Sequence, residues 1–442
     1  MSFSCSEVAA IVGADASKTN IREIALTALL MVEAGEFSNH IINKALEKHT
    51  RLDARDRALF VKLVHGTLEY QYTIDHLIDA YSKVKVRKMK PMIRNLLRMS
   101  VYQLLFLDKI PAAAVVDESV KLVKKSPLRN LSGFVNGVLR SMERDRSRFD
   151  LQSRTMKYSV PEELLKLLDE SLMCGDAING DMVCGDGIHQ DMFPEEDVPG
   201  NPTDDFLAYT LSEQGTSIRT VGTDEIRMVQ NIGNLTELPE WKEGKIIVQD
   251  YASSLPVRLS SIRPGDTVLD VCAAPGGKSI QAAERVGTEG KVIACDLTLK
   301  KTGKITENCR RTGITNIETR VQDATVRNPE FVGIADVVIA DLPCSGLGTI
   351  GKKPEIKNRF AMTATLDLAE IQKRILNNVC EYVKPGGELV FSTCTISHYE
   401  NEDNVRAFLA EHPAFAIKSM KQYLPTEKQP MDGFFVCVME RK

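Results

Sequence analysis

The sequence predicts a multidomain protein with an N-terminal all-helical bundle, a small mixed α/β connecting region and a C-terminal α/β domain. Two patterns support this fold class. Apolar residues recur at helical spacing from Ile21 to about Arg146. Beyond residue 246, short β-branched runs alternate with helix-length segments, which is typical of a doubly wound parallel sheet. The 442 residues also exceed the roughly 100–200 residues of one ordinary domain.

The composition narrows the class of protein. The formal net charge is −4 at pH 7, which argues against uniform coating of a nucleic acid, so any such binding must be local. No apolar run approaches the ~20 residues needed to cross a bilayer, and the first residues lack the pattern of a signal peptide. The ten cysteines are scattered and indicate free thiols rather than a disulfide framework. We therefore expect a cytoplasmic protein without a membrane partner.

The first predicted domain, residues 15–150, is a bundle of helices that carries a basic segment. Between Ala80 and Leu107 the sequence has no Asp or Glu. Seven basic residues fall in this window: Lys83, Lys85, Arg87, Lys88, Lys90, Arg94 and Arg98. A run of charge is often only a solvated face. Because no acid compensates this one, we interpret it as a patch that faces nucleic-acid phosphates.

The second predicted region, residues 151–245, contains an acidic insert, residues 174–205. The insert holds nine acidic residues and three prolines but no Lys or Arg, so we expect a flexible loop or linker. A short repeat within it places Cys174, Cys184 and His189 near several Asp residues. Zinc prefers closely paired thiolate and imidazole ligands, and this spacing supplies at most three good ones, so we expect no metal site. The rest of the region is expected to be a small mixed α/β segment.

The third predicted domain, residues 246–442, has the strand pattern of a seven-stranded α/β sheet. Five β-branched runs are separated by helix-length segments: Thr267–Cys272, Lys291–Asp296, Ile317–Asp323, Asp336–Asp341 and Gly387–Ser392. Two later runs, Phe415–Ser419 and Phe434–Glu440, have no helix-length gap between them, which predicts an antiparallel pair at the sheet edge. A nucleotide dehydrogenase does not usually end in this way, whereas an antiparallel seventh strand is typical of methyltransferases that use S-adenosylmethionine.

The turn after the first of these strands reads DVCAAPGGKS, from Asp270 to Ser279. Its small residues let the backbone approach a ligand, and the helix that begins near Lys278 points amide groups toward it. A Walker phosphate loop is excluded because Cys272 occupies the position of its first glycine. The Gly-x-Gly-x-x-Gly fingerprint of dinucleotide-binding proteins is also absent from this turn. The remaining candidate ligand is S-adenosyl-L-methionine, with its amino-acid end at the turn.

Acidic residues end three successive predicted strands. Asp296 ends the second strand, where a carboxylate suits the ribose hydroxyls of the cofactor. Asp323 ends the third strand and can accept a hydrogen bond from the adenine amino group, and Asp341 ends the fourth. A single acid at a strand end could merely cap the next helix. Three together favour a cofactor site.

Two cysteines follow neighbouring predicted strands. The segment ADLPCSGLGTI has Cys344 where amine-directed methyltransferases place an aromatic ring, so the methyl acceptor is predicted to be a carbon atom. Carbon 5 of cytosine is a poor nucleophile until a thiolate adds to carbon 6. A base must then remove the proton from carbon 5, and an acid at ring nitrogen 3 stabilises the intermediate. Cys344 and Cys394 are both candidates for the attacking thiol, and the chemistry leaves the choice open.

The other cysteines are interpreted as structural: Cys5, Cys174, Cys184, Cys295, Cys309, Cys380, Cys437 and the side chain of Cys272.

Three motifs and the helical region resemble one family. DVCAAPGGKS, DLPCSGLGTI and STCTISHYENED are similar to the cofactor turn, the Pro-Cys motif and the Thr-Cys motif of the RsmB (Sun, Fmu) class of RNA cytosine-5 methyltransferases, which modify 16S ribosomal RNA. RDRALFVKLVHGTLEY and FVNGVLR resemble the NusB-like RNA-binding domain of these enzymes. The resemblance covers most of the chain and implies a Rossmann-like class I methyltransferase domain. The chain departs from the family where His398 and Tyr399 replace a Pro-Glu pair, and the family's Arg-x-Asn signature is not recognisable.

The resemblance implies a role for each site residue. Cys394 would be the nucleophile and Cys344 would assist release of the base, with Asp341 facing the base and Lys278 grouped with the catalytic residues. S-adenosyl-L-methionine would be bound by the turn and the strand-end acids: Cys272, Ala273, Ala274, Pro275, Gly276, Gly277, Lys278, Asp296, Asp323 and Asp341. The protein is expected to be a monomer. Its expected partner is RNA, above all ribosomal RNA, and not DNA. Two alternatives stay open: the same chemistry on transfer RNA, and a non-catalytic RNA-binding or assembly factor.

Overall fold

The computed structural model describes residues 20–173, 200–212, 215–230, 235–426 and 429–442. The chain folds into two compact units. The helical unit consists of Met1–Leu165 and Lys352–Arg359, and the sheet unit consists of Lys166–Gly351 and Phe360–Lys442. The acidic insert predicted at 174–205 lies mostly outside the described residues, and so do its two cysteines and its histidine.

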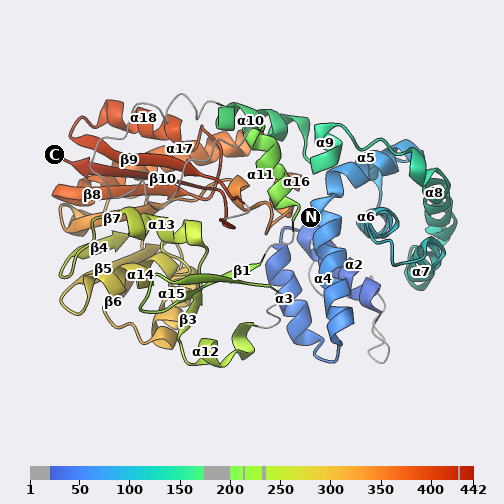
Figure 1. The fold of residues 1–442 in the computed structure, drawn as a ribbon, viewed down its shortest axis with the longest axis horizontal. Coiled ribbons are helices and arrows are strands. Elements are labelled where there is room, and N and C mark those ends of the chain that lie inside the picture. The colour runs from blue at the N-terminus through green and yellow to red at the C-terminus, as the bar shows by residue number, and fades with distance from the viewer. Residues whose placement is uncertain (1–19, 174–199, 213–214, 231–234, 427–428) are drawn as a thin grey trace. The chain divides into compact units, whose positions relative to one another are not determined.

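The helical unit confirms the predicted bundle, which is drawn in blue and teal in Figure 1. Asp53 begins one helix because its carboxylate accepts a hydrogen bond from the N–H of Asp56 at 2.8 Å, and Pro91 begins another. The apolar residues at helical spacing, such as Leu63 and Leu97, form one buried core. The helices are α2 (Ile21–Glu33), α3 (Ser38–Lys48), α4 (Ala54–Glu69), α5 (Gln71–Tyr81), α6 (Pro91–Phe106), α7 (Ala112–Lys125), α8 (Ser132–Asp145), α9 (Arg154–Tyr158) and α16 (Glu355–Asn358).

The second stretch of the helical unit, residues 352–359, is held by buried polar contacts. Glu355 accepts hydrogen bonds from the backbone N–H and the hydroxyl of Ser38, at 2.8 and 2.7 Å. Lys357 is 2% exposed, and its Nζ donates to the carbonyl oxygen of Tyr158 at 3.1 Å. Burial lowers the pKa of Lys357 to about 8 and raises the pKa of Glu69, its electrostatic partner, to about 7. Buried charged side chains need hydrogen-bond or ion-pair partners, and Glu355 and Lys357 find theirs in the helical unit. The stretch is therefore an integral part of that unit.

Only five of the seven residues predicted for the basic patch are exposed as a group. Arg98 is 7% exposed and donates to both carboxylate oxygens of Asp75, at 2.7 and 2.6 Å. Arg94 forms an ion pair with Glu33. Both arginines therefore stabilise the bundle through acids that lie outside the sequence window. The exposed remainder, called the basic patch below, is Lys83, Lys85, Arg87, Lys88 and Lys90.

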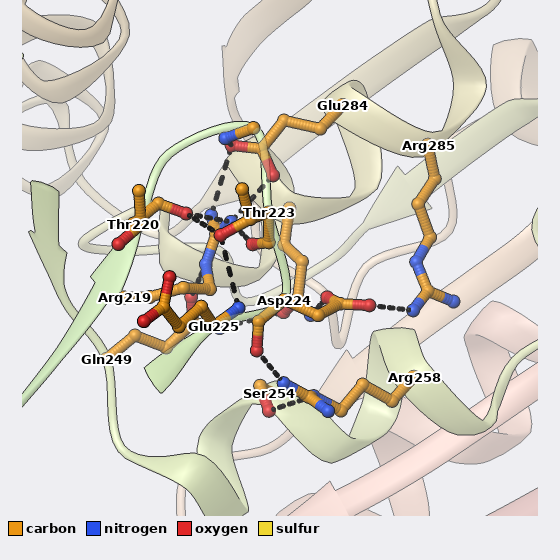
Figure 2. Close-up of polar contacts among 12 residues, drawn as sticks. Arg219, Thr220, Thr223, Asp224, Glu225, Gln249, Ser254, Arg258, Glu284 and Arg285 are labelled. Atoms are coloured by element: carbon orange, nitrogen blue, oxygen red, sulfur yellow. Dashed lines mark hydrogen bonds and ion pairs between the residues drawn. The ribbon is translucent and has the colours of Figure 1, made fainter. Parts of the chain in front are cut away.

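The sheet unit contains a small antiparallel sheet of three strands, β1 (Thr216–Thr220), β2 (Ile226–Val229) and β3 (Ile246–Val248), in the order β2-β1-β3. Figure 2 shows Arg219 of β1 among its polar partners. The fully buried Arg219 pairs with Glu284 at 2.6 Å and donates to the side chain of Gln249 at 2.7 Å. Because Glu284 lies on α14 (Gly277–Val286), this network ties the small sheet to the helix that follows the predicted cofactor turn.

The main sheet has seven strands in the order β6-β5-β4-β7-β8-β10-β9, drawn in yellow to red in Figure 1. β10 is antiparallel to β8 and β9, which confirms the predicted antiparallel seventh strand, while the other neighbouring strands are parallel. The last strand lies inside the sheet and β9 forms the edge. The strands are β4 (Thr267–Asp270), β5 (Lys291–Asp296), β6 (Ile317–Val321), β7 (Ala335–Asp341), β8 (Val383–Thr393), β9 (Phe415–Tyr423) and β10 (Phe434–Arg441).

Helices and buried cores cover both faces of the main sheet. On β4, Val268 and Leu269 are fully buried but belong to different cores, because successive side chains of a strand point to opposite faces. The unit also contains α10 (Glu162–Met173), which begins in the helical unit, α11 (Pro202–Thr210), α12 (Pro239–Lys242), α13 (Tyr251–Leu259), α15 (Leu299–Thr312), α17 (Met362–Val379) and α18 (Glu402–Glu411). Within the described part of the chain, no helix is long and apolar enough to span a bilayer.

Candidate active site

The turn between β4 and α14 depends on a glycine at position 276. Gly276 adopts a φ of +107°, a conformation that favours glycine, and a Cβ added there would lie 3.1 Å from Ile305. Asp296, at the end of β5, holds the turn from the other side. Its Oδ2 accepts a hydrogen bond from the N–H of Ala274 at 3.0 Å, and its Oδ1 pairs with Lys301 at 2.9 Å. The turn and the second strand-end acid therefore come together as predicted from the parallel sheet.

The groups around this turn fit S-adenosyl-L-methionine. Asp270 is fully buried beneath the turn, and only its Oδ2 is bonded, by the hydroxyl of Ser279 at 2.7 Å. Its Oδ1 has no hydrogen-bond partner among the described residues, and burial raises the pKa of Asp270 to about 7. A carboxylate oxygen with spare capacity suits the cationic amino group of the cofactor. Leu297 and Leu299, 57% and 79% exposed just after Asp296, offer apolar surface for an adenine ring.

Asp323 lies just beyond the end of β6, with its carboxylate exposed. Its Oδ1 accepts hydrogen bonds from the N–H and the hydroxyl of Thr325, at 2.9 and 2.7 Å, and these bonds lower the pKa of Asp323. Within the described parts of the chain, both of these side-chain hydrogen bonds go to Oδ1. The assignment of Asp323 to the adenine amino group stays a prediction.

Lys278 and Asp341 form an ion pair at the ends of α14 and β7. The Nζ of Lys278 lies 2.6 Å from Oδ2 of Asp341 and donates to the hydroxyl of Ser253 at 3.0 Å. The other oxygen of Asp341 accepts a hydrogen bond from the hydroxyl of Ser392, at 2.9 Å. Because Lys278 is only 9% exposed, its ammonium is held in one place, beside the carboxylate that follows the fourth strand.

The two predicted thiols meet between the ends of β7 and β8. The sulfur atoms of Cys344 and Cys394 lie 3.4 Å apart, and both residues are partly exposed. Contact with the Cys394 sulfur and burial raise the pKa of Cys344 well above its usual range. The raised pKa favours the protonated form of the Cys344 thiol. The remaining described cysteines are buried except Cys272, whose thiol pKa is raised by burial, as expected for structural residues.

Sequence reasoning missed a buried carboxylate near the two thiols. Glu400 is fully buried and accepts a hydrogen bond from the N–H of Ser345 at 2.8 Å. The only signal in the sequence was its place in the Thr-Cys motif. His398, two residues earlier, forms a hydrogen bond through Nδ1 with Asp403 at 2.8 Å and packs against Tyr399 in a tilted ring contact with centroids 3.9 Å apart. His398 therefore stabilises the start of α18.

The comparisons with known proteins agree with this geometry. A family model described as 16S rRNA methyltransferase RsmB/F matches residues 258–439, and the NusB family model matches residues 19–144. A Bacillus subtilis (strain 168) protein named "Probable ribosomal RNA small subunit methyltransferase B" is 32% identical over 96% of this chain and 99% of its own length. Ribosomal RNA small subunit methyltransferase B of Vibrio vulnificus (strain YJ016) is 28% identical over 96% of this chain and 100% of its own length. The solved structure of PH0851 has the same fold, with a TM-score of 0.76, 24% identity, and coverage of 96% of this chain and 99% of that one.

The fold and the cofactor turn define an S-adenosylmethionine-dependent methyltransferase. Both family models match in the order that the sequence predicts, with the helical region first. The chain belongs to the RsmB/F family of 16S rRNA methyltransferases. This finding confirms the resemblance that the three motifs carry.

Proposed function

We propose that the protein methylates carbon 5 of a cytosine in 16S ribosomal RNA through a covalent bond between Cys394 and carbon 6. The observation that carries the proposal is the 3.4 Å contact between Cys344 and Cys394, next to the Lys278–Asp341 pair. Methylation of carbon 5 of cytosine requires a thiol to activate the ring, and a second thiol beside the first supports release of the product. The names of the relatives and the NusB match support ribosomal RNA as the substrate.

The proposed reaction begins with the sulfur of Cys394. Its thiolate bonds to carbon 6, and the π electrons of the 5,6 double bond move toward carbon 5 and ring nitrogen 3. Lys278 and Asp341, paired at 2.6 Å, can donate a hydrogen bond from the ammonium to that nitrogen, which stabilises the electron-rich ring. S-adenosylmethionine supplies the methyl group that carbon 5 then bonds.

Release of the product restores the double bond. The proton on carbon 5 leaves to solvent water, its electron pair forms the 5,6 double bond again, and the bond between carbon 6 and Cys394 breaks with its electrons on the sulfur. Cys344 lies 3.4 Å from the departing sulfur and keeps its own proton, so its thiol stabilises the leaving thiolate by a hydrogen bond. The carbon–sulfur bond therefore breaks more readily with Cys344 in place.

The Cys344→Ala variant is expected to trap the covalent intermediate. Cys394 can still attack, but the leaving thiolate loses its hydrogen-bond donor, so multiple-turnover methylation falls by at least about 10²-fold. A protein–RNA adduct that survives denaturing electrophoresis and needs the cofactor would be the readout. Cys309→Ala removes a buried thiol outside the pair and serves as the control without adduct. Unchanged turnover by Cys344→Ala would remove Cys344 from the mechanism.

Bisulfite mapping tests the proposed function as a whole. One cytosine of 16S ribosomal RNA should resist conversion in cells that contain the protein and should convert in cells that lack it. Re-expression of the chain should restore the protected cytosine. A change confined to transfer RNA would transfer the same chemistry to that substrate, and an unchanged pattern in both RNAs would defeat the proposal in favour of a non-catalytic factor.

Neutralising the basic patch is expected to weaken RNA binding and flatten its salt dependence. Lys85, Arg87 and Lys88 are exposed, and among the described residues only Lys85 forms an ion pair, with Asp79 at 3.9 Å. Replacing all three by Gln should reduce the slope of log affinity against log salt by about 2–3, because each phosphate contact contributes ~0.7–0.9.

A triple variant of equal charge change controls for net charge. Lys44, Lys48 and Arg55 are exposed on other parts of the helical unit. Their replacement by Gln should leave the salt slope within about one unit of the wild type. Equal slopes for the two triple variants would show that the basic patch has no special role.

A further inference from the structure

A single buried carboxylate connects the two loops that carry the thiols. Glu400 accepts hydrogen bonds from the backbone N–H and the hydroxyl of Ser345 and from the hydroxyl of Thr395. Ser345 directly follows Cys344, and Thr395 directly follows Cys394. One side chain therefore holds the residue after each thiol.

Further contacts close this arrangement from both sides. The hydroxyls of Ser345 and Thr395 lie 2.7 Å apart, so the two loops also touch directly. Gln372, from α17, donates to Glu400 at 3.2 Å and to the carbonyl oxygen of Pro343, the residue before Cys344, at 2.9 Å. These groups form one network around the Pro-Cys loop.

Asn401 extends the network to the other side of Cys394. Its Oδ1 accepts a hydrogen bond from the hydroxyl of Thr393 at 2.5 Å, and its Nδ2 donates to the carbonyl oxygen of Thr395 at 3.2 Å. Thr393 and Thr395 flank Cys394, and both are fully buried. The backbone on each side of the thiol is therefore fixed.

We propose that Glu400 is a positioning residue that sets the approach of Cys344 to Cys394. The inference rests on the proposed function for its catalytic meaning, but the geometric part stands on the contacts alone. Glu400 is fully buried, so it acts through the loops and does not contact substrate. Burying a carboxylate costs free energy, whereas burying an apolar side chain of similar size does not. A role in fixing the two loops would explain why a carboxylate is present here.

The same chain offers a matched control in Glu388. This residue lies in the middle of β8, six residues before Cys394, and is 3% exposed. Its carboxylate accepts hydrogen bonds from the backbone N–H and the hydroxyl of Ser261, both at 2.7 Å. Glu388 therefore binds a serine in the same way as Glu400 but is remote from the thiols.

The first experiment measures the approach of the thiols without RNA or cofactor. Diamide takes one hydrogen atom from each of two thiols as their sulfur–sulfur bond forms, and its nitrogen–nitrogen double bond is reduced. The wild-type chain should form the Cys344–Cys394 disulfide readily, as measured by peptide mass spectrometry over time. Glu400→Ala should form it at least about tenfold more slowly, because a displacement of about 1 Å has large effects on rates of this kind. Glu388→Ala should react at the wild-type rate.

A milder variant covers the case in which Glu400→Ala does not fold. Ser345→Ala keeps Glu400 but removes the hydroxyl that contacts both Glu400 and Thr395, and it should slow disulfide formation by a smaller factor. For variants that fold, methyl transfer to 16S ribosomal RNA should lose turnover number while the KM for S-adenosylmethionine stays within about twofold of the wild type.

Two results would overturn the inference: disulfide formation at the wild-type rate in both Glu400→Ala and Ser345→Ala, or equal slowing by Glu388→Ala. Slowed disulfide formation together with full methylation by Cys394→Ala would instead keep the positioning role and defeat the covalent mechanism. The two failures are thus distinguishable.

Discussion

Cys394→Ala is expected to abolish methyl transfer and leave the fold and cofactor binding intact. Without the sulfur atom no bond to carbon 6 forms, and carbon 5 stays too electron-poor to bond a methyl group. The turnover number should fall by at least about 10⁴-fold, the size of effect seen when the nucleophile of a covalent enzyme is removed. Transfer of a radiolabelled methyl group to 16S ribosomal RNA measures the loss, and calorimetry measures cofactor affinity.

The two thiol variants are informative as a pair. Cys394→Ala should form no covalent adduct, whereas Cys344→Ala should accumulate one. The opposite pattern would make Cys344 the nucleophile. The 3.4 Å contact between the two sulfur atoms does not by itself decide which of them attacks. Full activity of Cys394→Ala would end the assignment of Cys394, and retained activity in Cys309→Ala would show that loss of a thiol elsewhere is harmless.

The features that could be predicted from the sequence are those fixed by regular secondary structure. Asp296 and Asp341 end β-branched runs, and parallel strands bring such ends to one edge of the sheet. The same rule brings Cys344 and Cys394 together across a separation of 50 residues, because β7 and β8 are neighbours. Strand order and strand ends thus accounted for the centre of the site.

The features that could not be predicted are contacts between residues on different helices and strands. No local sequence pattern indicates which residues will form such contacts. Helical spacing shows which face of α6 is buried, but it does not show that Arg98 finds Asp75 on another helix. Arg219 in the short strand β1 similarly gave no signal of its pairing with Glu284, 65 residues away. Such contacts follow from the packed tertiary structure, where each buried charge must meet a complementary one.

The stretch from 352 to 359 is the largest feature of this kind. Its sequence places it in the predicted methyltransferase domain, residues 246–442, yet it belongs to the helical unit. It begins eight residues after Cys344 in the chain. The helical unit is therefore completed by a stretch of chain that follows the Pro-Cys loop in the sequence.

Glu355→Ala is accordingly expected to open the helical unit at α3. The change leaves the fully buried N–H and hydroxyl of Ser38 without an acceptor, at a cost of about 2–5 kcal/mol. Amide hydrogens of α3 should exchange more than about tenfold faster, since ~1.4 kcal/mol is a factor of ten. Hydrogen–deuterium exchange read by mass spectrometry separates this local effect from any change in the strands of the main sheet.

Two further variants grade the effect. Ser38→Ala removes only the hydroxyl and keeps the backbone N–H bonded to Glu355, so it should accelerate exchange less than Glu355→Ala does. Glu47→Ala changes an exposed glutamate on the same helix and should leave exchange unchanged. Wild-type exchange at α3 in Glu355→Ala would show that the helical unit does not depend on residues 352–359.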